Sequence, residues 1–208
     1  MSADAMRGRF LLLAPVLAGA LAAPPAATAA EPPDGQFSVQ SINGSGCRAA
    51  TTQVRLRDLS RVDVSFTALQ AQQGRGVPAS SRRSACTVSL RAPAVRGYTF
   101  GVDNVLLRGR ATLPAGTSAT ATASSWFVGS PRTVHAEREI PGVFDAIWDL
   151  RAVVRPGSVS WMPCGTNTPV NLRVDVRVDA RPGGVGRISL DAGTNEPSAS
   201  YRFAWKRC

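Results

Sequence analysis

Apolar and polar residues alternate along most of the chain. In the clearest run, residues 172–180, every second position is apolar, and the positions between them alternate arginine with aspartate. A period of two predicts a β-strand with one buried face. We expect the charged face of this strand to be a solvated outer surface, because opposite charges follow one another along it.

The same alternation recurs in short runs elsewhere, at 54–56, 62–66, 88–90, 98–102, 144–150 and 201–205. No segment after residue 30 has the period of an amphipathic helix, and turn-forming residues separate the runs. Roughly nine to eleven short strands predict an all-β protein with two antiparallel sheets packed as a β-sandwich, a jelly roll being one form of it. We interpret 183–186 as a hairpin turn, and 70–85 as a long loop that is a plausible contact element.

The N-terminus has the pattern of a secretory signal peptide. Arg7 and Arg9 precede an apolar stretch, Phe10–Ala23, and small residues at 27–29 fit a cleavage site. The predicted organisation is a signal peptide over 1–30 and a single β-sandwich domain over 31–208. The sequence therefore predicts a secreted, extracellular protein without a transmembrane anchor after cleavage.

Four cysteines lie in the predicted mature chain: Cys47, Cys86, Cys164 and Cys208. An even number in an exported protein indicates two disulfides. Three pairings are possible, and we favour Cys47 with Cys86 and Cys164 with Cys208, because these are neighbours in sequence. No Cys-x-x-Cys spacing is present, so we expect no metal and no cofactor.

The charge is strongly positive, a formal +10, and all but one of the 24 cationic residues are arginine. This skew has two interpretations: the codon usage of a GC-rich, bacterial genome, or a surface selected to bind anions. The basic character survives removal of residues 1–30, which contain only two arginines. We expect adhesion to anionic polymers of the cell envelope or matrix, and no sequence-specific recognition of nucleic acid.

Candidate chemistry is sparse. His135, Glu137 and Glu139 fall on one face of a predicted strand, where they fit either a small acid–base site or an ordinary exposed sheet face. Trp126 is the tryptophan most open to contact with a ligand such as a sugar ring. Asp145 and Asp149 share another strand face without a predicted cleft between them. No residue is assigned a catalytic role.

Several motifs together resemble a known family. They are Gly44-Ser45-Gly46-Cys47, a glycine-rich stretch running to Cys86, Trp161-Met162-Pro163-Cys164-Gly165 and the closing Tyr201–Cys208. In order and spacing the chain resembles the secreted family catalogued as domain of unknown function 4360. The resemblance implies a secreted protein of this length with its cysteines paired in the order favoured above. It implies no activity.

Three functions remain open from the sequence. The first is a non-enzymatic extracellular or envelope-associated binding protein, which we expect to be a monomer. The second is a carbohydrate-active or other secreted hydrolase that uses carboxylates or His135. The third is a secreted inhibitor or toxin-like protein that inserts a rigid loop into its partner.

Overall fold

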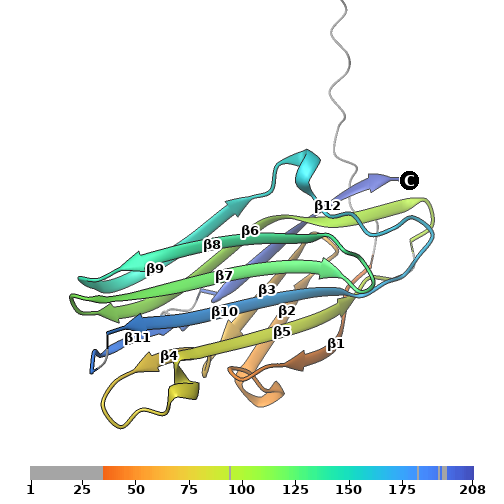
Figure 1. Cartoon of the computed structure of the whole chain (residues 1–208). Coiled ribbons are helices and arrows are strands. Elements are labelled where there is room, and N and C mark those ends of the chain that lie inside the picture. Colours follow the sequence, from red (N-terminus) through yellow and green to blue (C-terminus); the bar gives the residue numbers. More distant parts are fainter. Residues whose placement is uncertain (1–34, 94, 182, 192, 194–195) are drawn as a thin grey trace, which may run out of the picture.

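The computed structural model of the protein describes residues 35–93, 95–181, 183–191, 193 and 196–208. Two antiparallel β-sheets make up this part of the chain and lie in two layers (Figure 1). The predicted two-sheet sandwich is therefore confirmed. The predicted signal peptide lies outside the described residues, so the division into 1–30 and one domain over 31–208 stays a prediction.

Sheet A has five strands, which lie in the order β1 (Ser38–Asn43), β5 (Arg83–Arg91), β10 (Val170–Ala180), β7 (Thr117–Phe127) and β8 (Thr133–Pro141). In β7 three of the six buried positions hold alanine, and in β10 most hold valine. The outward positions of these two strands carry hydroxyl and charged side chains. The alternation in the sequence thus places apolar side chains on the core face of sheet A and polar side chains on its outer face.

Sheet B has seven strands. Six follow the order β2 (Thr52–Arg57), β3 (Arg61–Phe66), β12 (Ala199–Arg207), β6 (Tyr98–Leu113), β11 (Gly186–Ser189) and β4 (Gln70–Gln73). The seventh, β9 (Phe144–Val153), pairs with β6 along residues 104–113. Three short 3-10 helices lie between strands: η1 (Ala49–Thr51), η2 (Ala79–Arg82) and η3 (Pro156–Ser158).

Aromatic rings from both sheets meet in the core around Phe100 of β6. The Phe100 ring lies 5.3 Å from the ring of Phe127 in sheet A and 5.0 Å from that of Trp205 in sheet B, measured between centroids. The buried Trp205 indole donates a hydrogen bond to the Leu59 carbonyl oxygen at 2.7 Å. The core thus joins the two sheets without leaving this indole N–H unpaired.

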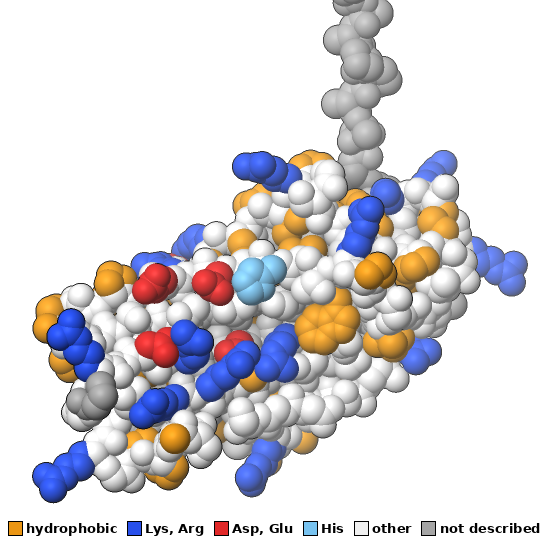
Figure 2. All heavy atoms as spheres, in the orientation of Figure 1, with side chains coloured by type: hydrophobic (Ala, Val, Ile, Leu, Met, Phe, Trp, Pro, Cys, Tyr) orange, Lys and Arg blue, Asp and Glu red, His pale blue; other side chains and the backbone are white. Residues whose placement is uncertain are grey.

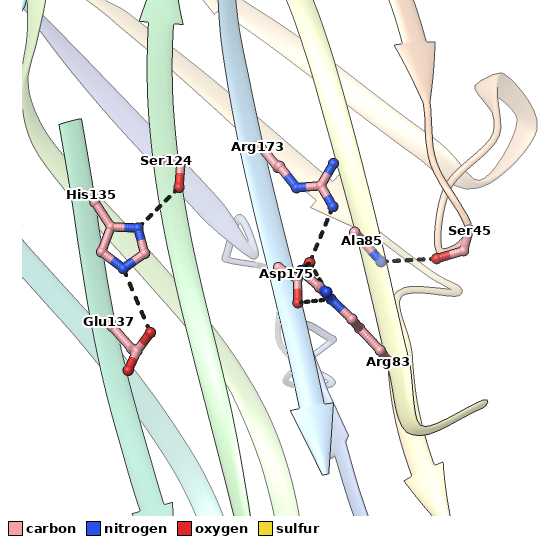
Figure 3. Close-up of polar contacts among 8 residues, drawn as sticks. All are labelled: Ser45, Arg83, Ala85, Ser124, His135, Glu137, Arg173 and Asp175. Carbon is pink, nitrogen blue, oxygen red and sulfur yellow. Dashed lines mark hydrogen bonds and ion pairs between the residues drawn. The ribbon is translucent and has the colours of Figure 1, made fainter. Parts of the chain in front are cut away.

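Both disulfides have the predicted pairing, with Cα atoms 5.5 Å apart in Cys47–Cys86 and 5.9 Å apart in Cys164–Cys208. At the first disulfide, the turn after β1 packs against β5 so closely that a Cβ atom on Gly44 would lie 2.1 Å from the Ala85 carbonyl oxygen. The Ala85 amide donates to Ser45 Oγ at 3.1 Å (Figure 3). The Gly-Ser-Gly-Cys motif is therefore structural, because only glycine fits this approach.

Two predictions about connections are wrong. Residues 183–186 do not form a hairpin turn, because the chain passes there from β10 in sheet A to β11, which pairs with β4 and β6 in sheet B. Most of the predicted loop 70–85 is ordered as β4, η2 and the start of β5. The polar glutamines of β4 hid its alternation, although Ala71 and Gln73 are buried there. The described residues contain twelve strands instead of nine to eleven.

Candidate functional site

The outer face of sheet A is organised in rows of side chains that cross its strands. On β7 the outward residues Thr120, Thr122 and Ser124 form a central line of short hydroxyl side chains. Each pairs on one side with β8 and on the other side with β10. The rows are Glu139–Thr120–Arg177, Glu137–Thr122–Asp175 and His135–Ser124–Arg173. Longer polar side chains therefore flank a low central line on both sides.

These rows enclose a groove of about 470 Å³. Its lining residues come from β8, β7, β10 and the start of β5: His135, Glu137, Thr120, Thr122, Ser124, Arg173, Asp175, Arg177 and Arg83. In Figure 2 the uncharged strip along β7 separates acidic side chains and the histidine on β8 from alternating basic and acidic side chains on β10. The groove is open to solvent on the outer face of sheet A.

The β8 side of the groove centres on His135. Its Nδ1 lies 3.3 Å from Ser124 Oγ, and its Nε2 lies 3.5 Å from Glu137 Oε2 (Figure 3). The side chains of His135 and Glu137 are 54% and 55% exposed, so water competes for these contacts. The contacts orient the imidazole over the groove floor.

The opposite side of the groove centres on a clamped carboxylate. Arg83 donates from Nε to both oxygens of Asp175 at 2.9 Å, and Arg173 Nη2 donates to Asp175 Oδ2 at 3.2 Å (Figure 3). The hydrogen bonds to Asp175 raise the pKa of the Arg83 guanidinium. One row further along, Arg177 Nε donates to Asp179 at 2.7 Å. The cations of this wall are thus matched by carboxylates.

An aromatic ring lies beside the groove. Trp126 is half-buried on the same face as Ser124, two residues further along β7, and pairs with Asn171 and Thr133 in the neighbouring strands. Of the other tryptophans, Trp148 and Trp205 are buried in the core and Trp161 is half-buried. Trp126 is therefore the tryptophan that continues the line of the groove floor.

The structure brings the predicted candidates His135, Glu137, Glu139 and Trp126 together on the outer face of sheet A. Their function stays a prediction. Sequence reasoning missed the β7 hydroxyls and Arg83, although the alternation of alanine with threonine at 119–123 indicated one uniform polar face.

Asp145 and Asp149 lie outside the groove, on β9 in sheet B. Asp145 Oδ1 lies 3.1 Å from Arg110 Nη2, and Asp149 Oδ1 lies 2.7 Å from Arg108 Nε. The Arg108 hydrogen bond holds the pKa of Asp149 below its ordinary value. Both carboxylates are thus bound in ion pairs instead of facing each other across a cleft, as a glycosidase pair would.

The described ranges contain neither a candidate metal site nor a helix that could span a membrane. No group of three or more His, Cys, Asp or Glu side chains there could hold a metal ion. Nor does that part of the chain contain a helix long and apolar enough to cross a bilayer.

Comparisons with known proteins give a family and a secreted relative. The family model described as Domain of unknown function (DUF4360) matches residues 36–208. An "Uncharacterized secreted protein" of Arthroderma benhamiae is 26% identical over 170 residues, which cover 81% of this chain and 69% of the relative. With its two disulfides, which persist in oxidising compartments, this chain is likewise a secreted protein.

A solved structure, TmCBM61 in complex with beta-1,4-galactotriose, also matches. Its sequence identity is 10% and its TM-score 0.30, over 83% of this chain and 88% of that chain. A likeness at this TM-score carries no information about the ligand of the present protein.

Proposed function

Because the chain belongs to the DUF4360 family, whose description assigns no activity, we propose its function from its surface. It is a non-enzymatic, extracellular binding protein that holds a polysaccharide of the cell envelope or matrix in the groove of sheet A. The observation that carries this proposal is the line of Thr120, Thr122 and Ser124 between two charged walls, which Trp126 continues along β7.

The groove offers the chemistry that sugar rings need. Sugars present many hydroxyl groups that both donate and accept hydrogen bonds, together with apolar ring faces. The walls supply a carboxylate acceptor in Glu137 and guanidinium donors in Arg173 and Arg177. The half-buried Trp126 ring supplies an apolar surface for stacking. Because the floor of the groove carries short side chains, a polysaccharide has room to lie along the strands.

The charge balance of the groove favours a hydroxyl-rich chain over a polyanion. Asp175 already holds Arg83 and Arg173, and Asp179 holds Arg177. The other wall adds the carboxylates of Glu137 and Glu139. A polyanion in the groove would meet these acids as well as the cations. We therefore place an uncharged polysaccharide there.

A binding screen with paired variants tests the proposal. The secreted chain is offered insoluble cellulose, β-1,3-glucan and mannan, and the polymer that retains it is titrated. Trp126→Ala should raise the dissociation constant about tenfold, since stacking contributes about 0.5–1.5 kcal/mol beyond burial. Thr122→Val should weaken binding by a smaller factor, because it removes a floor hydroxyl at nearly constant shape.

Matched controls lie on sheet B. Ile147→Ala removes an exposed apolar side chain of β9, and Thr112→Val removes an exposed hydroxyl of β6. Neither should change the affinity. Retention by none of the polymers, or equal affinities for the wild type, Trp126→Ala and Thr122→Val, would refute the groove as the binding site.

Hydrolysis is a second candidate function, favoured by one observation. Ser124, His135 and Glu137 stand in the order nucleophile, base and carboxylate across β7 and β8. We rank it below binding because these side chains are exposed and their contacts are long. The test is ester hydrolysis with p-nitrophenyl acetate and acetylated xylan. Activity above buffer that Ser124→Ala and His135→Ala both abolish would establish it, and activity that both variants retain would dismiss it.

The inhibitor-like alternative requires a rigid loop that enters a partner's cleft. The longest irregular segment expected from the sequence, 70–85, does not supply a loop of that length. That segment consists largely of β4, η2 and the start of β5, with only 74–78 between these elements. A protease panel that shows no inhibition at micromolar protein would complete the case against it.

A further inference from the structure

One end of the sandwich collects exposed cations. It lies where β6 begins and β12 ends, the right-hand end in Figures 1 and 2, where basic side chains project from the surface. We call it the cationic end and define it by five exposed residues from four segments: Arg96, Arg132, Arg155, Lys206 and Arg207.

Backbone contacts hold these segments together. The Cys208 amide donates to the Gly97 carbonyl oxygen at 2.9 Å, which joins the last residues of β12 to the segment of Arg96. Ser160 Oγ donates to the carbonyl oxygen of Arg132 at 3.4 Å, which joins the segment before Trp161 to the β7–β8 connection. The segments that carry the charges are therefore joined in space although they are distant in sequence.

The scaffold under the cationic end is rigid. Disulfide Cys164–Cys208 fixes the chain terminus, the Met162 amide donates to the Phe100 carbonyl oxygen at 3.0 Å, and Thr99 Oγ1 donates to the Met162 carbonyl oxygen at 2.5 Å. A ligand that binds here therefore meets a backbone that is already ordered. The entropic cost of binding is correspondingly low.

Lys206, the one lysine of the chain, is positioned by an aromatic ring. Its Nζ lies 4.2 Å from the centroid of the Trp161 ring, within the range of a cation–π interaction. The contact holds the ammonium group at the surface without neutralising it. The ammonium group is thus oriented in advance of any ligand.

No described acidic residue forms an ion pair with the cations of this end. Every ion pair between described residues involves other cations, from Arg57 to Arg202, and none involves the five residues of the cationic end. Their field therefore acts on the solvent side. We propose that the cationic end is a second binding site, separate from the groove, which takes the carboxylate groups of an acidic polysaccharide.

The surface favours an acidic polysaccharide over a nucleic acid. Proteins that bind single strands stack bases on free aromatic faces. The half-buried Trp161 ring already carries the Lys206 ammonium group over one face. Because the protein is secreted, acidic polysaccharides of the cell surface and matrix lie within its reach. Binding to nucleic acid is an outcome that the experiment distinguishes.

The experiment compares two triple variants of equal net charge. One, Arg96→Gln/Lys206→Gln/Arg207→Gln, removes three charges of the cationic end. The control, Arg75→Gln/Arg82→Gln/Arg181→Gln, removes three exposed arginines near the opposite end of sheet A, where no described residue forms an ion pair with them. Each protein is titrated with polygalacturonate, neutral dextran and double-stranded DNA between about 50 and 300 mM salt.

The wild type should bind polygalacturonate with an affinity that falls steeply with salt, whereas its affinity for neutral dextran should not change with salt. The first triple variant should bind at least tenfold more weakly, and the control less than threefold more weakly. Equal losses in both variants would show that only net charge matters and would overturn the site. Absent or salt-independent polygalacturonate binding, or tighter binding to DNA, would overturn it too. Both triple variants keep Trp126. Their affinity for the neutral polymer that the groove retains therefore tests the groove independently of the cationic end.

Discussion

The groove and the cationic end are built from the same arginine-rich composition, yet they present opposite electrostatics. In the groove, Asp175 lies between Arg83 and Arg173, so each guanidinium is bound by its neighbour. At the cationic end, Lys206 contacts the Trp161 ring. Arg207 forms no ion pair with an acid among the described residues. The comparison teaches that net charge does not identify a binding surface. The placement of the carboxylates decides which cations are free to bind a ligand.

The largest predicted effect concerns the disulfide that supports only the cationic end. Cys164→Ser/Cys208→Ser should lower the free energy of unfolding by about 2–5 kcal/mol, because it releases a constraint across 44 residues. It should also weaken polygalacturonate binding, while neutral polysaccharide still binds in the groove. Thermal unfolding and the two titrations measure these effects.

The other disulfide provides the control. Cys47→Ser/Cys86→Ser removes a constraint of similar span, 39 residues, at the start of sheet A. It should cost comparable stability without a selective loss of polygalacturonate binding. If both double variants reduce polygalacturonate binding equally, the cationic end does not depend on its own scaffold and the comparison fails.

A smaller effect is expected when the arginines of the groove lose their carboxylate partner, as the cations of the cationic end have none among the described residues. Asp175→Asn removes the carboxylate that holds Arg83 and Arg173, whose own side chains are 64% and 39% exposed. We expect the free energy of unfolding to fall by about 1–2 kcal/mol, because the buried acceptor of two charged hydrogen bonds is lost. The freed cations should give the groove a new, salt-sensitive affinity for polygalacturonate.

Asp179→Asn is the matched control. Its carboxylate is 50% exposed and is paired with Arg177 alone, so the stability loss should stay below about 0.5 kcal/mol. Chemical denaturation measures both variants. An Asp175→Asn protein that is as stable as Asp179→Asn and binds polygalacturonate no more tightly than the wild type does would contradict the role given to the paired carboxylate.

The sequence predicted the strands well, because period-two alternation follows directly from burial of one face. It predicted the outer face of 172–180 and the common face of His135, Glu137 and Glu139 for the same reason. It did not predict which strands pair, since β10 and β11 are neighbours in sequence but lie in different sheets. The Arg83–Asp175 contact, which joins residues 92 positions apart, depends on that pairing and was missed.

The cationic end could not be predicted from the sequence for a related reason. Its charges come from four segments that acquire a common location only through the β6–β12 pairing and the Cys164–Cys208 disulfide. The motif Trp161–Gly165 was visible in the sequence, but its contact with Lys206 was not. Long-range pairing, which local patterns do not encode, therefore decides where function is placed on this fold.

The smallest predicted effect tests whether ion pairs between arginine and aspartate also stabilise the outer face of sheet B. Asp63 accepts hydrogen bonds from Arg61 at 2.7 Å and from Arg57 at 3.0 Å. Burial raises the pKa of Asp63, but hydrogen bonds from Arg61, Ser200 and Arg57 outweigh it, so the pKa lies below its ordinary value of 3.8. A carboxyl group with a lowered folded pKa stabilises the protein above the unfolded pKa and loses this contribution as the pH falls.

Asp63→Asn should therefore be less stable than the wild type by about 0.5–1 kcal/mol at pH 7, since both arginines are half exposed. The difference should shrink below about pH 4 and vanish once the wild-type carboxyl is protonated. Asp145→Asn, whose carboxylate is 64% exposed beside Arg110, should show almost no difference at any pH. A gap between Asp63→Asn and the wild type that persists after the wild-type carboxyl is protonated would mean that Asp63 stabilises sheet B by packing and not by its charge.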